Sequence, residues 1–158
     1  MQLARSAREN DHAIAPGGTL VSALLLLMPA QAQDKIPSPF AQETLIKTTL
    51  LTLNDANVTG NYTVLHAKLA KQFRDNINAD KLKQAFKSFA DQKIDFGVIA
   101  PKTPIATSES KIDSRGALNL RGYFDTKPVR LTYELDYLPS EGEWKPASIN
   151  VNLKRPEG

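Results

Sequence analysis

The sequence predicts an α+β domain in which about three N-terminal helices pack on a curved antiparallel sheet of four to five strands. Three observations carry this prediction. Apolar residues recur at helical spacing between residues 40 and 92, and beyond that stretch they alternate with polar residues. Clusters of turn-forming residues then divide the alternating part into short strands. Because such strands have one apolar side, the helices are expected to cover one face of the sheet and leave the other in water.

The first helix is expected to begin at Ser38-Pro39, where serine can cap the helix and proline suits its first position. Its apolar residues then recur at helical spacing, as Ile46, Leu50 and Leu53. The pattern weakens after Leu53, and the helix is predicted to end near Gly60.

Two further helices are expected before residue 92. Asn61 is a candidate cap for the second helix and Asn78 for the third, where Asp80 would interact favourably with the helix dipole. The predicted apolar stripes are Tyr62, Leu65, His66, Leu69 and Phe73 in the second helix and Leu82, Ala85, Phe86 and Phe89 in the third.

The alternating part of the chain predicts a meander of strands. They are expected over residues 94–98, 105–112, 118–124, 129–137 and 144–153, with turns at 113–116, 125–128 and 139–142. Gly122 is predicted to mark a bulge or bend within its strand. The last strand begins at Trp144 and is expected to direct Ala147, Ile149, Val151 and Leu153 inward.

A short apolar run near the N-terminus is typical of a secretory signal peptide. The run covers residues 20–28, Pro29 ends it, and Ala30-Gln31-Ala32 supplies the small residues of a cleavage site. It is shorter than the roughly 20 apolar residues that a membrane span needs. The predicted organisation is therefore a signal peptide (1–32), a flexible leader (33–39) and a folded domain (40–154). We expect a periplasmic or secreted protein that makes no stable membrane insertion after cleavage.

Composition excludes several classes of function. The chain has no cysteine, which excludes a disulfide framework, a lipid-modified N-terminal cysteine and thiol catalysis. The net charge of +3 comes from scattered basic residues, so no nucleic-acid partner is expected. Cleavage would leave His66 as the only histidine, and zinc needs three or four convergent ligands. No metal site and no cofactor are expected.

Four stretches of the chain carry a resemblance to a known family. They are residues 60–74, 120–124, 131–137 and 144–151, which includes the Trp-Lys-Pro-Ala-Ser-Ile-Asn-Val of the last strand. Their order resembles the nuclear transport factor 2-like superfamily over roughly residues 40–153. The resemblance implies a cone-shaped, cystatin-like fold with a ligand site between the helices and the concave face of the sheet. That superfamily contains isomerases, cyclases, dehydratases and transport factors, so the fold assigns no activity.

The candidate pocket follows from this implied site. Its candidate lining residues are Tyr62, His66, Phe73, Phe96, Tyr133 and Trp144. Aromatic side chains of this kind can equally form ordinary core. His66 can serve as a general base near neutral pH or as a packed residue with one hydrogen bond. No catalytic residue is assigned, because no carboxylate is predicted on the apolar strand face where the superfamily's isomerases hold their base.

Three classes of function remain open, and the first is favoured. In the first class, the chain is expected to be an exported, non-catalytic binding or accessory domain. It would take a small apolar ligand in its pocket or a protein partner on its outer sheet face. Alternatively, it is a pocket enzyme of the isomerase, cyclase or dehydratase type with His66 as base. A third alternative is an assembly module of the cell envelope that forms a homodimer through the outer sheet face. That face is predicted to carry Arg130, Thr132, Glu134 and Asp136.

Overall fold

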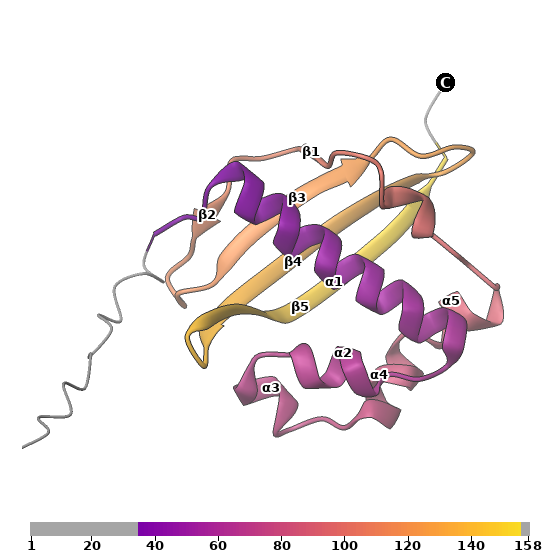
Figure 1. Cartoon of the computed structure of the whole chain (residues 1–158), viewed down its shortest axis with the longest axis horizontal. Helices are drawn as coiled ribbons and strands as arrows, with labels where there is room; N and C mark the ends of the chain where they lie inside the picture. Colours follow the sequence, from indigo (N-terminus) through magenta and orange to yellow (C-terminus); the bar gives the residue numbers. More distant parts are fainter. Residues whose placement is uncertain (1–34, 156–158) are drawn as a thin grey trace, which may run out of the picture.

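A long helix crosses one face of a five-stranded antiparallel sheet in the computed structural model, which describes residues 35–155 (Figure 1). The helices are α1 (Pro39–Thr59), α2 (Thr63–Lys68), α3 (Lys71–Arg74), α4 (Ala79–Ala85), α5 (Lys87–Asp91) and the 3₁₀ helix η2 (Gly97–Ile99). The strands are β1 (Ile105–Ala106), β2 (Lys111–Ile112), β3 (Leu118–Phe124), β4 (Arg130–Ser140) and β5 (Glu143–Lys154). The predicted α+β class is therefore confirmed. The predicted signal peptide lies outside the described residues.

Helix α1 has the start and the end that the sequence predicts. The Ser38 hydroxyl oxygen accepts a hydrogen bond from the backbone N–H of Ala41 at 3.3 Å, and Pro39 occupies the first helical turn. Gly60 ends the helix in the left-handed conformation, with φ +72°, and its N–H donates to the Ala56 carbonyl. The buried side of α1 carries Ile46, Leu50 and Leu53, which pack on the sheet as expected.

The second and third predicted helices are each split in two. Helix α2 stops at Leu69, which is extended, because the backbone N–H of Ala70 donates to the carbonyl of Pro146 on β5 at 2.8 Å. The chain resumes as α3, and Phe73 is 40% exposed rather than part of one apolar stripe. Asn78 caps α4 as predicted, through its bond to the N–H of Lys81 at 2.9 Å, but α4 ends before α5 begins.

The strand predicted over residues 94–98 is wrong, since residues 94–96 form neither helix nor strand and η2 begins at Gly97. The Asn54 side chain on α1 accepts a hydrogen bond from the N–H of Phe96 at 2.8 Å and donates to the Asp95 carboxylate at 2.9 Å. The same carboxylate accepts from the N–H of Gly97, and these bonds hold the pKa of Asp95 below its usual value. Backbone groups that a strand ladder would use are thus taken by side chains.

The sheet has the order β1-β3-β4-β5, and β2 pairs with the same strand as β1. Two short strands therefore replace the single strand predicted over residues 105–112. Gly122 marks no bulge, because β3 and β4 stay in register around it. A Cβ at Gly122 would instead lie 2.4 Å from both the Tyr133 hydroxyl and the Ile105 carbonyl, so close packing requires glycine there.

The bulge lies in β5, at Ala147. Pro146 pairs with Tyr137 and Ser148 pairs with Asp136, so Ala147 has no partner on β4. This extra residue shifts the alternation: Pro146 is buried, while Ala147 lines a hollow next to Asp136. The prediction that Ala147 points inward with Ile149 is therefore wrong.

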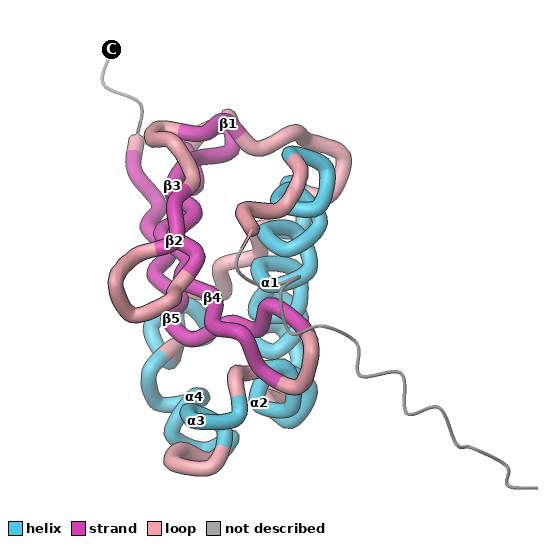
Figure 2. The backbone as a smooth tube through the Cα atoms, turned by 90° about the vertical axis from the view of Figure 1, so that its left-hand side faces the viewer, coloured by secondary structure: helices cyan, strands magenta, loops and turns pink. Residues whose placement is uncertain are grey.

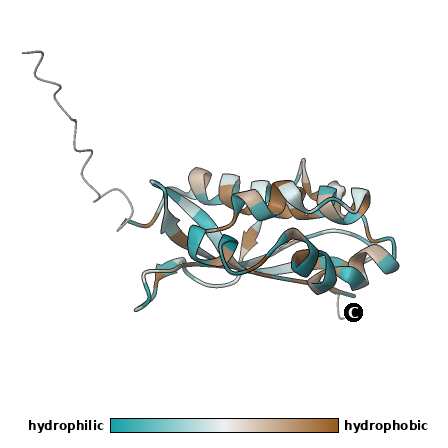
Figure 3. Cartoon of the chain, turned by 90° about the horizontal axis from the view of Figure 1, so that it is seen from below, coloured by the Kyte–Doolittle hydropathy of each residue, from teal (hydrophilic) through white to brown (hydrophobic). Residues whose placement is uncertain are grey.

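Two layers result, as the side view in Figure 2 shows: α1 lies on one face of the sheet, and α2, α3 and α4 gather at one end. Apolar and polar residues alternate along α1 and along the strands (Figure 3). The hydrophobic core is formed there, and its sheet residues are Leu118, Leu120, Phe124, Leu131, Tyr133, Leu135, Tyr137 and Val151. Strands β4 and β5 are joined by a tight turn at Glu141-Gly142, where both residues have positive φ.

Candidate functional site

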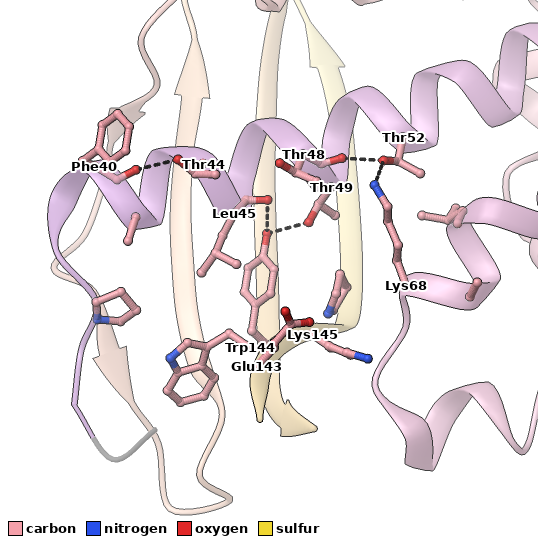
Figure 4. Close-up of a pocket in the computed structure, with 16 residues that line it drawn as sticks. Phe40, Thr44, Leu45, Thr48, Thr49, Thr52, Lys68, Glu143, Trp144 and Lys145 are labelled. Carbon is pink, nitrogen blue, oxygen red and sulfur yellow. Dashed lines mark hydrogen bonds between the residues drawn. The ribbon is translucent and has the colours of Figure 1, made fainter. Parts of the chain in front are cut away.

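A groove runs between the N-terminal half of α1, the end of α2 and the hairpin of β4 and β5 (Figure 4). Its volume of about 670 Å³ lies within the range of small-molecule sites. The bulge at Ala147 helps to build it, because Trp144 and Pro146 thereby share the helix-facing side of the hairpin with Tyr137. The apolar residues of the lining are Pro37, Phe40, Ala41, Leu45, Leu65, Ala67, Trp144 and Pro146.

Phe40 is the feature that sets this groove apart from the core. It lies in the first turn of α1 and is 80% exposed, although it is a large aromatic side chain. In Figure 4 the Phe40 ring projects from the side of α1 away from the hairpin, whereas Trp144, which also lines the groove, lies on the hairpin and is half-buried. Exposed apolar side chains gathered in a concave surface are typical of a binding site.

The inner wall of the groove is fixed by Tyr137. Its hydroxyl group donates a hydrogen bond to the Leu45 carbonyl at 3.0 Å and lies 2.9 Å from the hydroxyl of Thr49. The phenol oxygen thus makes two hydrogen bonds to α1. Burial raises the pKa of Tyr137 well above its usual range. The phenol therefore stays protonated at neutral pH and serves as a structural anchor.

Three threonines, Thr44, Thr48 and Thr52, lie one helical turn apart along the α1 side of the groove. Thr44 donates its hydroxyl proton to the Phe40 carbonyl at 3.0 Å, and Thr52 donates to the Thr48 carbonyl at 2.7 Å. Because these two protons are given to the helix backbone, the hydroxyl oxygens can only accept further bonds. The ammonium group of Lys68 makes one such bond to Thr52, at 3.0 Å.

Charged side chains at the groove differ in how they are paired. Lys145 forms an ion pair with Glu141, which also pairs with Arg74 at 2.7 Å. Arg74 first, and Lys145 second, lower the pKa of Glu141 to about 2. Lys68 and Glu143 also line the groove, and neither forms an ion pair with another described residue.

The six candidate pocket residues are not brought together by the structure. Only Trp144 lines the groove. Tyr62, Phe96 and Tyr133 are buried in the core, where burial raises the pKa of Tyr133 to about 12. Phe73 borders a separate, smaller hollow, which it shares with Arg115 and Asp136.

His66 lies outside the groove and contacts backbone carbonyls. Its Nε2 lies 2.6 Å from the Ile77 carbonyl and 3.0 Å from the Arg74 carbonyl, so this nitrogen carries the proton and donates. The bond ties α2 to the segment between α3 and α4. This is the geometry of a residue that holds structure together, with no carboxylate bonded to the ring among the described residues.

The predicted site residues did not include Phe40, Lys68 or the threonines of α1. A usable signal was present, since Phe40, Thr44, Thr48 and Thr52 recur every four residues and therefore share one face of a helix. That face carries no charge and only one large apolar residue. Sequence patterns do not show that a hairpin folds against it.

The outer face of the sheet carries charges that are paired within the chain. Asp136 binds Arg121 at 2.6 Å and accepts a hydrogen bond from Asn119 at 2.8 Å. Arg130 lies over the ring of Tyr123, with its guanidinium carbon 4.2 Å from the ring centre. Two of the four residues predicted to face a dimer partner thus have contacts in their own chain, and the dimer stays a prediction.

Within residues 35–155, no group of three or more His, Asp or Glu side chains comes together in a way that could hold a metal ion. No helix in that part of the chain combines the length and the apolar character needed to cross a membrane. In comparisons with known proteins, no family model, no curated protein and no solved structure matched this chain.

Proposed function

We propose that this protein is an exported, non-catalytic binding domain that holds a small apolar ligand in the groove between α1 and the hairpin. The observation that carries the proposal is Phe40, an aromatic residue exposed at the mouth of a groove whose other wall presents Trp144. An exposed phenylalanine adds nothing to folding stability, whereas its burial by a ligand is favourable by about 1.5–3 kcal/mol. A bound apolar ligand would therefore be stabilised by burying the Phe40 side chain.

The polar groups of the groove support binding rather than catalysis. The Tyr137 phenol is held protonated, and the hydroxyl protons of Thr44 and Thr52 are given to the helix. The pocket-enzyme alternative relied on His66, whose Nε2 proton is directed at two carbonyls away from the groove. No observation of the site favours that alternative.

Export and family membership belong to the same proposal. Export is supported by the apolar run over residues 20–28 and by Ala30-Gln31-Ala32. N-terminal sequencing of the secreted protein should find Gln33 first, and a mature chain that starts at Met1 would contradict export. Membership of the nuclear transport factor 2-like superfamily, with its cone shape, is supported by the order of elements, since helices precede an antiparallel sheet and cover one of its faces.

The protein carries its own reporter for ligand binding. Trp144 is the only tryptophan of the chain and lines the groove, so its fluorescence should change when the groove is occupied. We expect a saturable change on titration with dodecyl maltoside, a neutral molecule with one alkyl chain, below its micelle concentration. A linear, unsaturated response would contradict binding in the groove.

Two phenylalanine variants make the test specific. Phe40→Ala should weaken dodecyl maltoside binding about tenfold, because the alkyl chain loses an apolar contact worth about 1.4 kcal/mol. Phe73→Ala removes a partly exposed side chain of the same kind outside the groove and should leave the dissociation constant unchanged. Equal effects of both variants would place the binding elsewhere.

A further inference from the structure

The two ends of the groove differ in chemistry. One end has Phe40 and Trp144, both aromatic, and the other has Thr52 and Lys68 (Figure 4). Both Phe40 and Thr52 belong to α1, and at about 1.5 Å per residue the helix between them is about 18 Å long. The groove is therefore elongated, apolar at one end and cationic at the other.

Lys68 is the cation available at that end. Lys145 also lines the groove, but its ammonium group is bound to Glu141. Lys68 forms no ion pair with any described residue, and its contact is the Thr52 hydroxyl at 3.0 Å. An ammonium group has three donors, so at least one N–H of Lys68 remains for an acceptor on a ligand. A carboxylate would supply both an acceptor and the opposite charge.

We propose that the ligand is an anionic molecule with a single alkyl chain, such as a long-chain carboxylate. This rests on the binding function proposed above. The alkyl chain lies along the apolar end of the groove, which Phe40 and Trp144 line, and the carboxylate accepts a hydrogen bond from Lys68. The elongated shape of the groove suits an extended chain better than a compact ring system.

The negative charge of Glu143 reduces the preference of the groove for an anionic ligand. It lines the groove from the same hairpin as Trp144 and Lys145, and it forms no ion pair with another described residue. Its charge repels a carboxylate in the groove, while Lys68 attracts it. Glu143→Gln should therefore strengthen the binding of an anion and leave the binding of a neutral molecule unchanged.

Three probes with the same alkyl chain test the head group: dodecanoate, dodecyl maltoside and dodecyltrimethylammonium, each below its micelle concentration. Trp144 fluorescence reports binding to the intact protein at low salt. We expect dodecanoate to bind most tightly and the cationic probe least tightly. Lys68→Gln should weaken dodecanoate binding about three- to tenfold, because an exposed charged hydrogen bond is lost, and should not change dodecyl maltoside binding. Added salt should weaken only the dodecanoate complex.

Lys81→Gln is the matched control, because Lys81 is an exposed lysine of α4 outside the groove. It should leave all three affinities unchanged. If dodecanoate and dodecyl maltoside bind equally and Lys68→Gln affects neither, the anionic ligand is excluded while the binding function stands. If the cationic probe binds most tightly, the assignment of the head group is overturned. If no probe gives saturable binding, both proposals fail.

Discussion

The layer formed by α1 and the sheet is held together differently from the segment that carries α2, α3, α4 and α5. In the layer, Leu50, Leu131 and Leu135 are completely buried and belong to one apolar core. In the segment, Leu82 is the only buried residue of the last three of these helices, and the helices are only four to seven residues long. Such short helices depend on contacts with the rest of the protein.

Leu65, Leu69 and Leu82 join the segment to the core, and individual polar bonds add to these contacts. His66 binds two carbonyls, the N–H of Ala70 binds β5, and Arg74 binds Glu141 at the hairpin turn. The layer is therefore stabilised almost entirely by apolar burial, whereas the stability of the segment also depends on single polar bonds. Regions of the second kind open locally at lower free energy than the core.

The largest effect is expected in the core. Leu135→Ala should lower the free energy of unfolding by about 2–5 kcal/mol, through lost apolar burial and the cavity that remains. Thr132→Ala lies on the outer face of the same strand and should change stability by about 0.5 kcal/mol or less. Urea unfolding of both variants gives the comparison. Equal losses would mean that the outer face is also buried, as a dimer interface would bury it.

A smaller effect is expected at His66. His66→Leu keeps the bulk of the side chain but removes the donor to Ile77 and Arg74, which should cost about 0.5–1.5 kcal/mol. Hydrogen exchange should increase in α2 and α4 and stay unchanged in β4. Dodecyl maltoside binding should be retained. A folded variant whose exchange rises equally everywhere would show that the segment does not open separately.

The smallest effect is expected for the contribution of Glu141 to stability, which should depend on pH. Its pKa is lowered to about 2 in the folded protein, against an ordinary value of 4.5, so its pairs with Arg74 and Lys145 stabilise the fold above about pH 4.5. This stabilisation is lost as the pH falls from 4.5 towards 2. The melting temperature of Glu141→Gln should be lower than that of the parent at pH 7, and the gap should close in this window.

Glu143→Gln is the control for the acid experiment, because Glu143 lies in the same hairpin without an ion pair among the described residues. Its gap from the parent should not depend on pH in this window. If the Glu141→Gln gap is the same at pH 2 and pH 7, the ion pairs do not join the hairpin to α3.

The fold could be predicted where local signals agreed with one another. Ser38, Pro39 and Gly60 marked both ends of α1, and alternation from residue 129 to residue 137 marked β4. The prediction over residues 94–98 was wrong because Asn54, far away in the sequence, binds the backbone there. Ala147 was misplaced because nothing in its local pattern indicates a bulge.

The candidate site could be predicted only in part. Trp144 was a predicted pocket residue that does line the groove, whereas Tyr62, Phe96 and Tyr133 fill the core. Periodicity shows that a side chain is on the apolar side of an element, but it does not separate core from cavity wall. Phe40 and Lys68 come from different helices, and only the folded chain brings them to one groove.

The unpaired residue at Ala147 decides on which side of the sheet the only tryptophan is found. Side chains alternate strictly along a regular strand, so a β5 that kept all its residues but had no bulge would place Ala147 and Lys145 on the same face as Ile149. In such a strand the indole ring of Trp144 would project from the outer face, and Lys145 would take its place opposite α1. The bulge thereby puts an aromatic wall where unbroken alternation would put a cationic one, while Ile149, Val151 and Leu153 keep their inward positions.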